Sequence, residues 1–275
     1  MPTYYSLKRP NPMVLLGVAF IVFTMTGCAT LQNGRGWGQD AVYPVDLKKI
    51  PDAAYHAFFD LQTLIPAAGA LVFGVSHADH KVSDWATDHT PIFGSKNNAN
   101  DASDYLLYAL EAETFLTALA TPSGEDPKDW AYSKAKGLTV ELGAELVTIG
   151  ATSLLKDVTD RSRPDGGSKS FPSHHSSEAF SSSTLANRNL NSITMSEKVR
   201  VPMQVANILL ATSVGWARVE AGKHFPSDVL AGAALGHFLS AFIHDAFMGL
   251  PRDNRLSFDV LPSKHGVMIG LSCAF

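Results

Sequence analysis

Three basic side chains and a histidine–aspartate pair could together bind an anion such as a phosphate ester and attack it. Six residues separate Lys156 from Arg163, and five separate Arg218 from His224. A phosphate monoester carries about two negative charges. An arginine can offer a planar fork to two of its oxygens, and a lysine acts as a point charge. This group of cations therefore predicts a site for a small anion.

His224 and Asp228 are four positions apart, with Pro226 between them. Proline suits the first turn of a helix, so we expect a helix to begin at Pro226, with Asp228 in its first turn. From there Asp228 can accept a hydrogen bond from Nδ1–H of His224. The Nε2 lone pair would then be free to attack phosphorus, and the carboxylate would stabilise the cation formed on attack.

The segment Pro172-Ser173-His174-His175 predicts the start of another helix. If Pro172 lies in its first turn, the backbone amides of Ser173 and His174 point outward. Such amides, together with the helix dipole, form a natural anion site. The hydroxyl of Ser173 can add one more donor.

In this order and at these spacings, the three motifs resemble the signature of the type 2 phosphatidic acid phosphatase family. That family includes bacterial non-specific acid phosphatases, lipid phosphatases and vanadium haloperoxidases. The resemblance covers roughly residues 130–248. It implies that His224 is a nucleophile forming a phosphohistidine, and that His175 protonates the leaving oxygen and then activates water. It implies neither a metal nor another cofactor, and it assigns phosphate binding to Lys156, Arg163, Ser173, the amide of His174, and Arg218.

Two positions depart from the family pattern. His174 stands where glycine is usual, which adds bulk at the phosphate and leaves open which of His174 and His175 is the acid; spacing favours His175. Ala217 stands where serine is usual, which removes one possible hydrogen bond.

The resemblance leaves the substrate open among lipid phosphates, isoprenoid diphosphates and soluble monoesters. Two other functions are also open: a vanadate-dependent haloperoxidase using the same site, and an envelope structural or assembly lipoprotein whose site is degenerate. A serine hydrolase built on Ser173 is disfavoured, because the chain lacks a Gly-x-Ser-x-Gly elbow and three cations would have no purpose.

The N-terminus has the pattern of a bacterial lipoprotein signal. Lys8 and Arg9 precede an apolar run at 13–25, too short to span a bilayer, and Gly27-Cys28 follows. This resembles a lipobox and implies cleavage before Cys28 and lipidation of its sulfur. Several acyl chains would hold the protein stably on a membrane. We expect it at the periplasmic face of the outer membrane in the bacterial cell envelope.

The bulk composition fits a buried core and argues against a nucleic-acid partner. Of the 275 residues, 45% are apolar, and 22 basic against 26 acidic residues give a formal charge of −4. An acidic balance does not suit binding to a nucleic-acid backbone, although a local cluster of cations can still bind a small anion.

The elements that must position the motifs are predicted to be helical. We expect an all-α bundle of about six helices with a short C-terminal β-hairpin. The predicted helices cover 52–75 with a break at Pro66, and 103–119, 130–155, a segment after Pro172, 197–219 and 226–248. Residues 77–102 and 121–129 are expected to be loops that set specificity. Polar residues interrupt the apolar stretches, which favours a bundle that does not insert into a membrane.

These patterns divide the chain into four parts. Residues 1–27 are a lipoprotein signal peptide, 28–50 a flexible tether, 51–250 the phosphatase domain and 251–275 a hairpin tail. Alternation of apolar and polar residues from Leu256 to Leu261 and from Val267 to Phe275 indicates the two strands of the tail.

Overall fold

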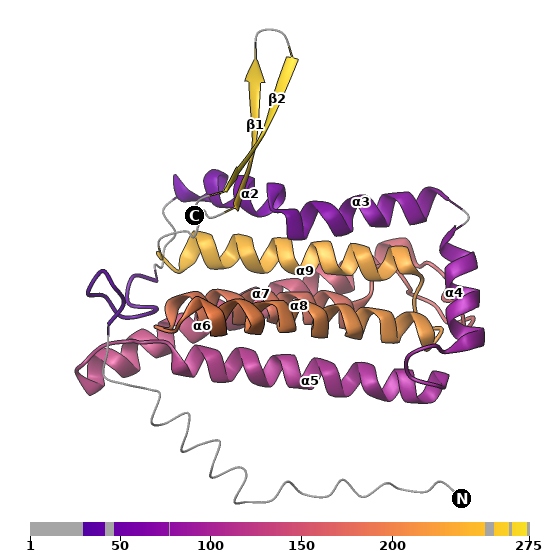
Figure 1. Cartoon of the computed structure of the whole chain (residues 1–275), viewed down its shortest axis with the longest axis horizontal. Helices are drawn as coiled ribbons and strands as arrows, with labels where there is room; N and C mark the ends of the chain where they lie inside the picture. The colour runs from indigo at the N-terminus through magenta and orange to yellow at the C-terminus, as the bar shows by residue number, and fades with distance from the viewer. Residues whose placement is uncertain (1–29, 42–46, 77, 251–255, 264–265, 274–275) are drawn as a thin grey trace, which may run out of the picture.

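The computed structural model describes residues 30–41, 47–76, 78–250, 256–263 and 266–273. The predicted signal peptide and its Cys28 lie outside these residues. Within them the chain forms a bundle of eight helices, shown in Figure 1. The helices are α2 (Lys49–Phe59), α3 (Leu61–Val75), α4 (Ala78–His89), α5 (Lys96–Ala120), α6 (Pro127–Thr159), α7 (His174–Ser192), α8 (Glu197–Glu220) and α9 (Pro226–Phe247).

The helical bundle agrees with the sequence prediction, but the number of helices does not. The segment predicted as a loop at 77–102 contains α4 and the first turns of α5. The helix predicted at 52–75 divides at Asp60 and not at Pro66, because the Asp60 carboxylate accepts a hydrogen bond from the amide of Gln62 at 2.8 Å and caps α3. Pro66 lies buried inside α3.

Helices α6 and α9, which carry parts of the motifs, begin at recognisable signals. Asp126 caps α6 ahead of Pro127, and Asp160 ends α6 in the left-handed region, with φ of 39°. Pro226 occupies the first turn of α9, as predicted. These signals place the end of α6 and the start of α9, which both carry residues of the candidate site.

Helix α9 runs between α3 and the layer that contains α7, as Figure 1 shows. Helices α7 and α9 pack with their backbones close together. A Cβ atom added at Gly232 would lie 2.5 Å from the carbonyl oxygen of Ser173, and one at Gly236 would lie 2.1 Å from that of Ser177. Only glycine permits this approach.

Part of the segment predicted as a flexible tether is packed on the bundle. Trp37 is fully buried in a cluster with Ala41, Ala118, Val140 and Met248. Its ring lies against Gly137, where an added Cβ atom would come within 2.2 Å of it. The tether prediction is therefore wrong for the residues around Trp37, because its large aromatic side chain packs against α6 at Gly137.

The outer faces of several helices are apolar. On α6, Leu142, Leu146, Leu154 and Val158 are each at least 58% exposed. By length and composition, α6 and α9 could each cross a membrane, and α2 with α3 forms a third candidate bent by 55°. The sequence analysis favoured a bundle that does not insert into a membrane. These helices do not support that expectation, because each contains a long apolar stretch with few charged residues.

After α9 the chain forms two antiparallel strands, β1 (Leu256–Ser263) and β2 (Gly266–Cys273). Their register pairs Leu256 with Cys273 and Ser263 with Gly266. In Figure 1 these strands extend away from the helices.

Candidate active site

The residues of the three motifs come together at one end of the bundle, where four helices begin or end. Lys156 lies in the last turn of α6 and Arg218 in the last turn of α8, whereas His174 and His175 begin α7 and Asp228 lies in the first turn of α9. Arg163 lies in the connection from α6 to α7, and His224 lies just ahead of α9.

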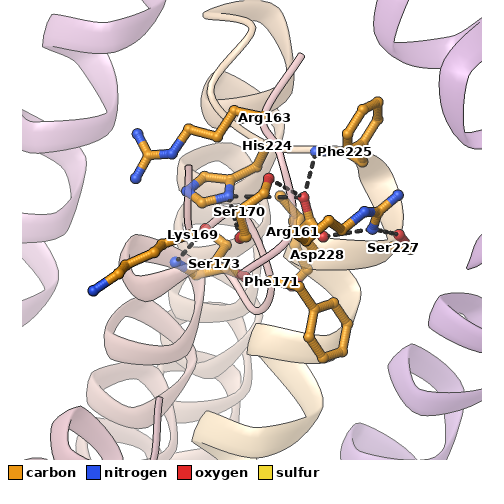
Figure 2. Close-up of polar contacts among 12 residues, drawn as sticks. Arg161, Arg163, Lys169, Ser170, Phe171, Ser173, His224, Phe225, Ser227 and Asp228 are labelled. Carbon is orange, nitrogen blue, oxygen red and sulfur yellow. Dashed lines mark hydrogen bonds and ion pairs between the residues drawn. The ribbon is translucent and has the colours of Figure 1, made fainter. Parts of the chain in front are cut away.

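Lys156 and Arg163 keep most of their hydrogen-bonding capacity. The Nζ atom of Lys156 donates to the carbonyl oxygen of Lys169 at 2.7 Å, and Nε of Arg163 donates to that of Ser168 at 3.0 Å. A lysine has three donors and an arginine five. In Figure 2 the guanidinium of Arg163 and the outer edge of the His224 ring lie on the same side, away from Asp228.

Arg218 is a buried cation held by neutral groups. It is 6% exposed, and its Nη1 atom donates to Oδ1 of Asn100 at 2.9 Å and to Oγ of Ser103 at 3.0 Å. Its Nε atom has no hydrogen-bond partner, and among the described residues no carboxylate lies within ion-pair distance of it. Burial lowers the pKa of Arg218 to about 10, and the charge of Arg163 acts in the same direction. A buried charge of this kind favours an anionic ligand.

The ring of His224 is 1% exposed and is held by a backbone carbonyl. Its Nδ1 atom lies 2.8 Å from the carbonyl oxygen of Ser170, and 3.9 Å from Oδ2 of Asp228. The prediction that Asp228 accepts the Nδ1 proton is therefore wrong in this geometry. Because a carbonyl can only accept, Nδ1 carries the proton and Nε2 keeps a lone pair.

His224 is also kept neutral. Burial, together with the positive charges of Lys156 and Arg218, lowers the pKa of His224 to about 4, although Asp228 acts in the opposite direction. These charges can act on the ring because both helix ends lie near it. The imidazole is therefore in its nucleophilic form at the pH of most cellular compartments.

Asp228 is fully buried, and its carboxylate is saturated by other partners. Its Oδ1 atom accepts from Nη1 of Arg161 at 2.6 Å. Its Oδ2 atom accepts from the hydroxyl of Ser170 at 2.5 Å and from the amide of Phe225 at 2.8 Å. Asp228 thus holds the loop residue whose carbonyl receives the proton of His224, as the dashed lines in Figure 2 show.

The start of α7 differs in detail from the prediction. Pro172 precedes the N-cap instead of lying in the first turn, and Ser173 is the N-cap residue. The amide of Ser173 donates to the carbonyl oxygen of Asp228 at 2.9 Å, so it does not point outward. Its hydroxyl oxygen accepts from the amide of Ser176 at 3.4 Å. The first-turn amides of His174 and His175 have no intrahelical partners, as at any helix start.

His174 and His175 have different carboxylate partners. The Nε2 atom of His175 lies 2.7 Å from Oδ1 of Asp104 on α5. Burial lowers the pKa of His175, and the charge of Arg218 adds to this, while Asp104 opposes it. The Nε2 atom of His174 lies 3.3 Å from Oε1 of Glu178, one turn along α7. The short contact with Asp104 orients the ring of His175.

Sequence reasoning missed the residues that α4 and α5 bring to the site, which are Asp79, Asn100, Ser103 and Asp104. It also left Arg161 out of the predicted site, whereas Arg161 donates to Asp228. The spacing of Arg161 from Arg163 was visible, but nothing in the sequence indicated a partner about 80 positions earlier.

Two cavities in the described part of the chain lie away from the motif residues. One of about 750 Å³ is lined by residues near the end of α7, the start of α8 and the end of α9, including Arg188 and His244. The other, of about 450 Å³, adjoins Asp60 and His237. No group of three or more His, Cys, Asp or Glu side chains within the described ranges could hold a metal ion.

Comparison with known proteins assigns the segment that contains most of these residues. A family model described as the PAP2 superfamily matches residues 164–252. This segment belongs to the PAP2 superfamily. The PAP2 segment contains Ser173, His174, His175, Arg218, His224 and Asp228, whereas Lys156 and Arg163 precede it. Membership supports a phosphatase-type function.

One solved structure is similar to the chain that carries this PAP2 segment. It is described as the first transmembrane PAP2 type phosphatidylglycerolphosphate phosphatase from Bacillus subtilis. The match has 24% sequence identity and a TM-score of 0.45, and covers 70% of this chain and 94% of that one. No curated protein matches the chain.

Proposed function

We propose that the chain is a metal-independent phosphatase that hydrolyses phosphate esters through a phosphohistidine on His224. The observation that carries this proposal is the state of His224: a buried, neutral ring whose Nδ1 proton is bound by the carbonyl of Ser170. Beside it, Arg218 is a buried cation with no ion-paired carboxylate among the described residues. A nucleophile and an anion site are thus adjacent in a PAP2 segment.

In the first step, Nε2 of His224 attacks phosphorus, the N–P bond forms, and the ester P–O bond breaks. The leaving oxygen takes a proton from His175, which Asp104 holds at 2.7 Å. In the second step, His175 takes a proton from water as that water attacks phosphorus. The N–P bond then breaks, inorganic phosphate leaves, and His224 is neutral again.

The cations supply the charge that this transfer needs. Lys156, Arg163 and Arg218 would bind the equatorial oxygens, together with the hydroxyl of Ser173 and the amide of His174. Fixed donors of this kind stabilise the transition state without reorganising. Because the side chains already provide positive charge, the mechanism needs no metal ion.

A phosphorylated lipid or isoprenoid diphosphate is the substrate class that best suits the outer surface. Large apolar side chains on α3 and α6 face outward, including Val75 at 86% and Val158 at 74% exposed. Exposed apolar faces of this extent mark contact with a membrane or another protein. A membrane-associated enzyme meets its lipid substrate in two dimensions, although soluble monoesters would fit the same phosphate site.

Membrane association can arise in two ways, and both belong to this proposal. Lipidation of Cys28 would attach the chain to the periplasmic face of the outer membrane. Insertion of α6 and α9 would instead place the bundle in a bilayer, since both are long and apolar enough.

Phosphate release by the full-length protein in detergent, with EDTA present, tests the function. Lipid phosphates, an isoprenoid diphosphate and soluble monoesters would be compared for the wild type and for His224→Ala. We expect release by the wild type and none by the variant. Activity that EDTA abolishes, or that His224→Ala retains, would contradict the mechanism.

Membrane attachment has its own test. Extraction of cell envelopes with sodium carbonate, for the wild type and for Cys28→Ser, separates the two modes. Loss of the Cys28→Ser variant into the soluble fraction supports a lipid anchor, and its retention supports inserted helices.

A further inference from the structure

The first turn of α4 is connected to the candidate nucleophile through charged groups. Asp79 is 2% exposed, although it lies 145 positions before His224 in the chain. Its Oδ1 atom accepts from the amide of Ser227 at 2.9 Å, and its Oδ2 atom accepts from the hydroxyl of Ser227 at 2.5 Å. Asp79 therefore holds the second residue of α9 by two hydrogen bonds.

Arg161 extends this connection to Asp228. Its Nη2 atom donates to Oδ2 of Asp79 at 2.7 Å, and its Nη1 atom donates to Oδ1 of Asp228 at 2.6 Å and to Oγ of Ser227 at 2.7 Å. Figure 2 shows Arg161 beside Asp228 and Ser227. The guanidinium carbon also lies 4.4 Å from the centre of the Phe225 ring. The planar fork of an arginine suits a bridge of this kind between two carboxylates.

The contacts continue without a gap to the ring of His224. Asp228 accepts from the hydroxyl of Ser170 at 2.5 Å, and the carbonyl of Ser170 accepts from Nδ1 of His224 at 2.8 Å. We infer that Asp79 and Arg161 are positioning residues for His224. They act through Asp228 and Ser170, and set the orientation of the ring from which Nε2 attacks phosphorus.

The inference rests on the proposed function and adds a part of the chain that the motifs do not include. Asp79 and Arg161 both precede the PAP2 match, which begins at residue 164. The bridge between them joins α4 to the N-terminus of α9, so the placement of α4 bears on the reacting atom. A charge bridge across two elements could instead serve only to stabilise the fold, and the experiment must separate these roles.

Asp79→Asn is the most direct variant, because it keeps the size of the side chain and removes its charge. A misplacement of about 1 Å in a reacting group can cost about 100-fold in rate, so a weakened orienting group should cost about 10–100-fold. We expect kcat to fall within that range while KM and the inhibition constant of inorganic phosphate stay unchanged, since the three cations are untouched. Asp88→Asn is the matched control, an exposed aspartate on the same helix that should leave kcat unchanged.

A double-mutant cycle tests whether the two residues act through one path. Arg161→Ala should lower kcat at least as much as Asp79→Asn, and Arg161→Lys should restore part of it. In the Arg161→Ala background, Asp79→Asn should cause little further loss. Equal and additive losses, or a loss confined to KM and phosphate inhibition, would overturn the inference.

A readout that does not need turnover keeps this result separate from failure of the proposed function. In ¹⁵N-histidine NMR spectra, the His224 resonance, assigned by its absence in His224→Ala, reports the proton on Nδ1. Asp79→Asn should shift this resonance, and Asp88→Asn should not. A wild type without phosphatase activity would overturn the proposed function alone. An unshifted resonance in Asp79→Asn would overturn the positioning inference, whatever the activity.

Discussion

The two sides of His224 differ in how completely their polar groups are paired. On the Nδ1 side, the carboxylates of Asp79 and Asp228 accept from Arg161, Ser170, Ser227 and backbone amides. On the other side, Arg218 is buried with a free Nε atom, and Lys156 and Arg163 have one donated bond each to a carbonyl oxygen.

The polar groups on the Nδ1 side are already paired, whereas the donors on the cationic side still lack an anionic partner. The paired side is rigid before any substrate arrives, because every strong acceptor there has its donor. The cationic side has donors in excess and lacks negative charge. We infer that the free energy of ligand binding comes from the cationic side, and that the paired side fixes the direction of attack.

The largest effect should come from removing the ring between the two sides. His224→Ala deletes the proposed nucleophile, and kcat should fall by about 1,000-fold or more. Steady-state phosphate release measures this, and His89→Ala, which changes an exposed histidine on α4, is the control. Near wild-type turnover by His224→Ala would show that the reaction does not pass through a phosphohistidine at this position.

Substitution on the cationic side should have the next largest effect. Arg218→Ala removes a buried cation that we propose binds the phosphate, and loss of one such donor costs about 100–1,000-fold in kcat. Inhibition by inorganic phosphate should weaken as well. Arg200→Ala is the matched control, because Arg200 lies on the same helix at its other end and pairs with Glu197.

A smaller effect is expected on the paired side. Ser170→Ala removes the hydroxyl that donates to Asp228 but keeps the carbonyl that accepts from His224. We expect kcat to fall by about 10-fold, because a small misplacement of the reacting ring lowers the rate, with phosphate inhibition unchanged. Ser168→Ala, an exposed serine in the same connection, should behave like the wild type. A change in phosphate inhibition without a change in kcat would contradict the division between the sides.

The smallest effect on kcat/KM is expected from lowering the pH. Burial lowers the pKa of His224 to about 4, from 6.5 for an ordinary histidine. Because only the neutral ring attacks, the His224-dependent limb of kcat/KM should stay flat as pH falls to 5, and reach roughly a tenth at pH 3. The unfolded chain binds the extra proton between pH 6.5 and 4, so stability should fall as pH falls through that window. A limb near pH 6.5 that His224 alone explains would show that the ring is not buried in solution.

The sequence predicted the ends of the helices that carry motifs better than it predicted their partners. Pro226 marked the start of α9, because this signal is local. The start of α6 was missed, since α6 begins at Pro127, inside the segment predicted as a loop. Asp104 reaches His175 from 71 positions away, and no local pattern encodes such a contact.

The acceptor for His224 could not have been chosen from residue types. It is the backbone carbonyl of Ser170, and every residue has such a group. Spacing alone favoured Asp228, whose carboxylate instead holds Ser170 through its hydroxyl. Helix α4 was missed because its polar composition resembles that of a loop, and its buried face contains Asp79, Ser83 and Ala86.

The packing of α7 against α9 depends on the absence of a side chain at Gly232. Gly232 lies on α9 one turn beyond Asp228, and a methyl group there would meet the Ser173 carbonyl at 2.5 Å. Helices α7 and α9 can therefore pack this closely only because position 232 has a hydrogen atom in place of a side chain. A single added carbon at Gly232 would force α7 and α9 apart, and with them His175 and His224, without changing either histidine.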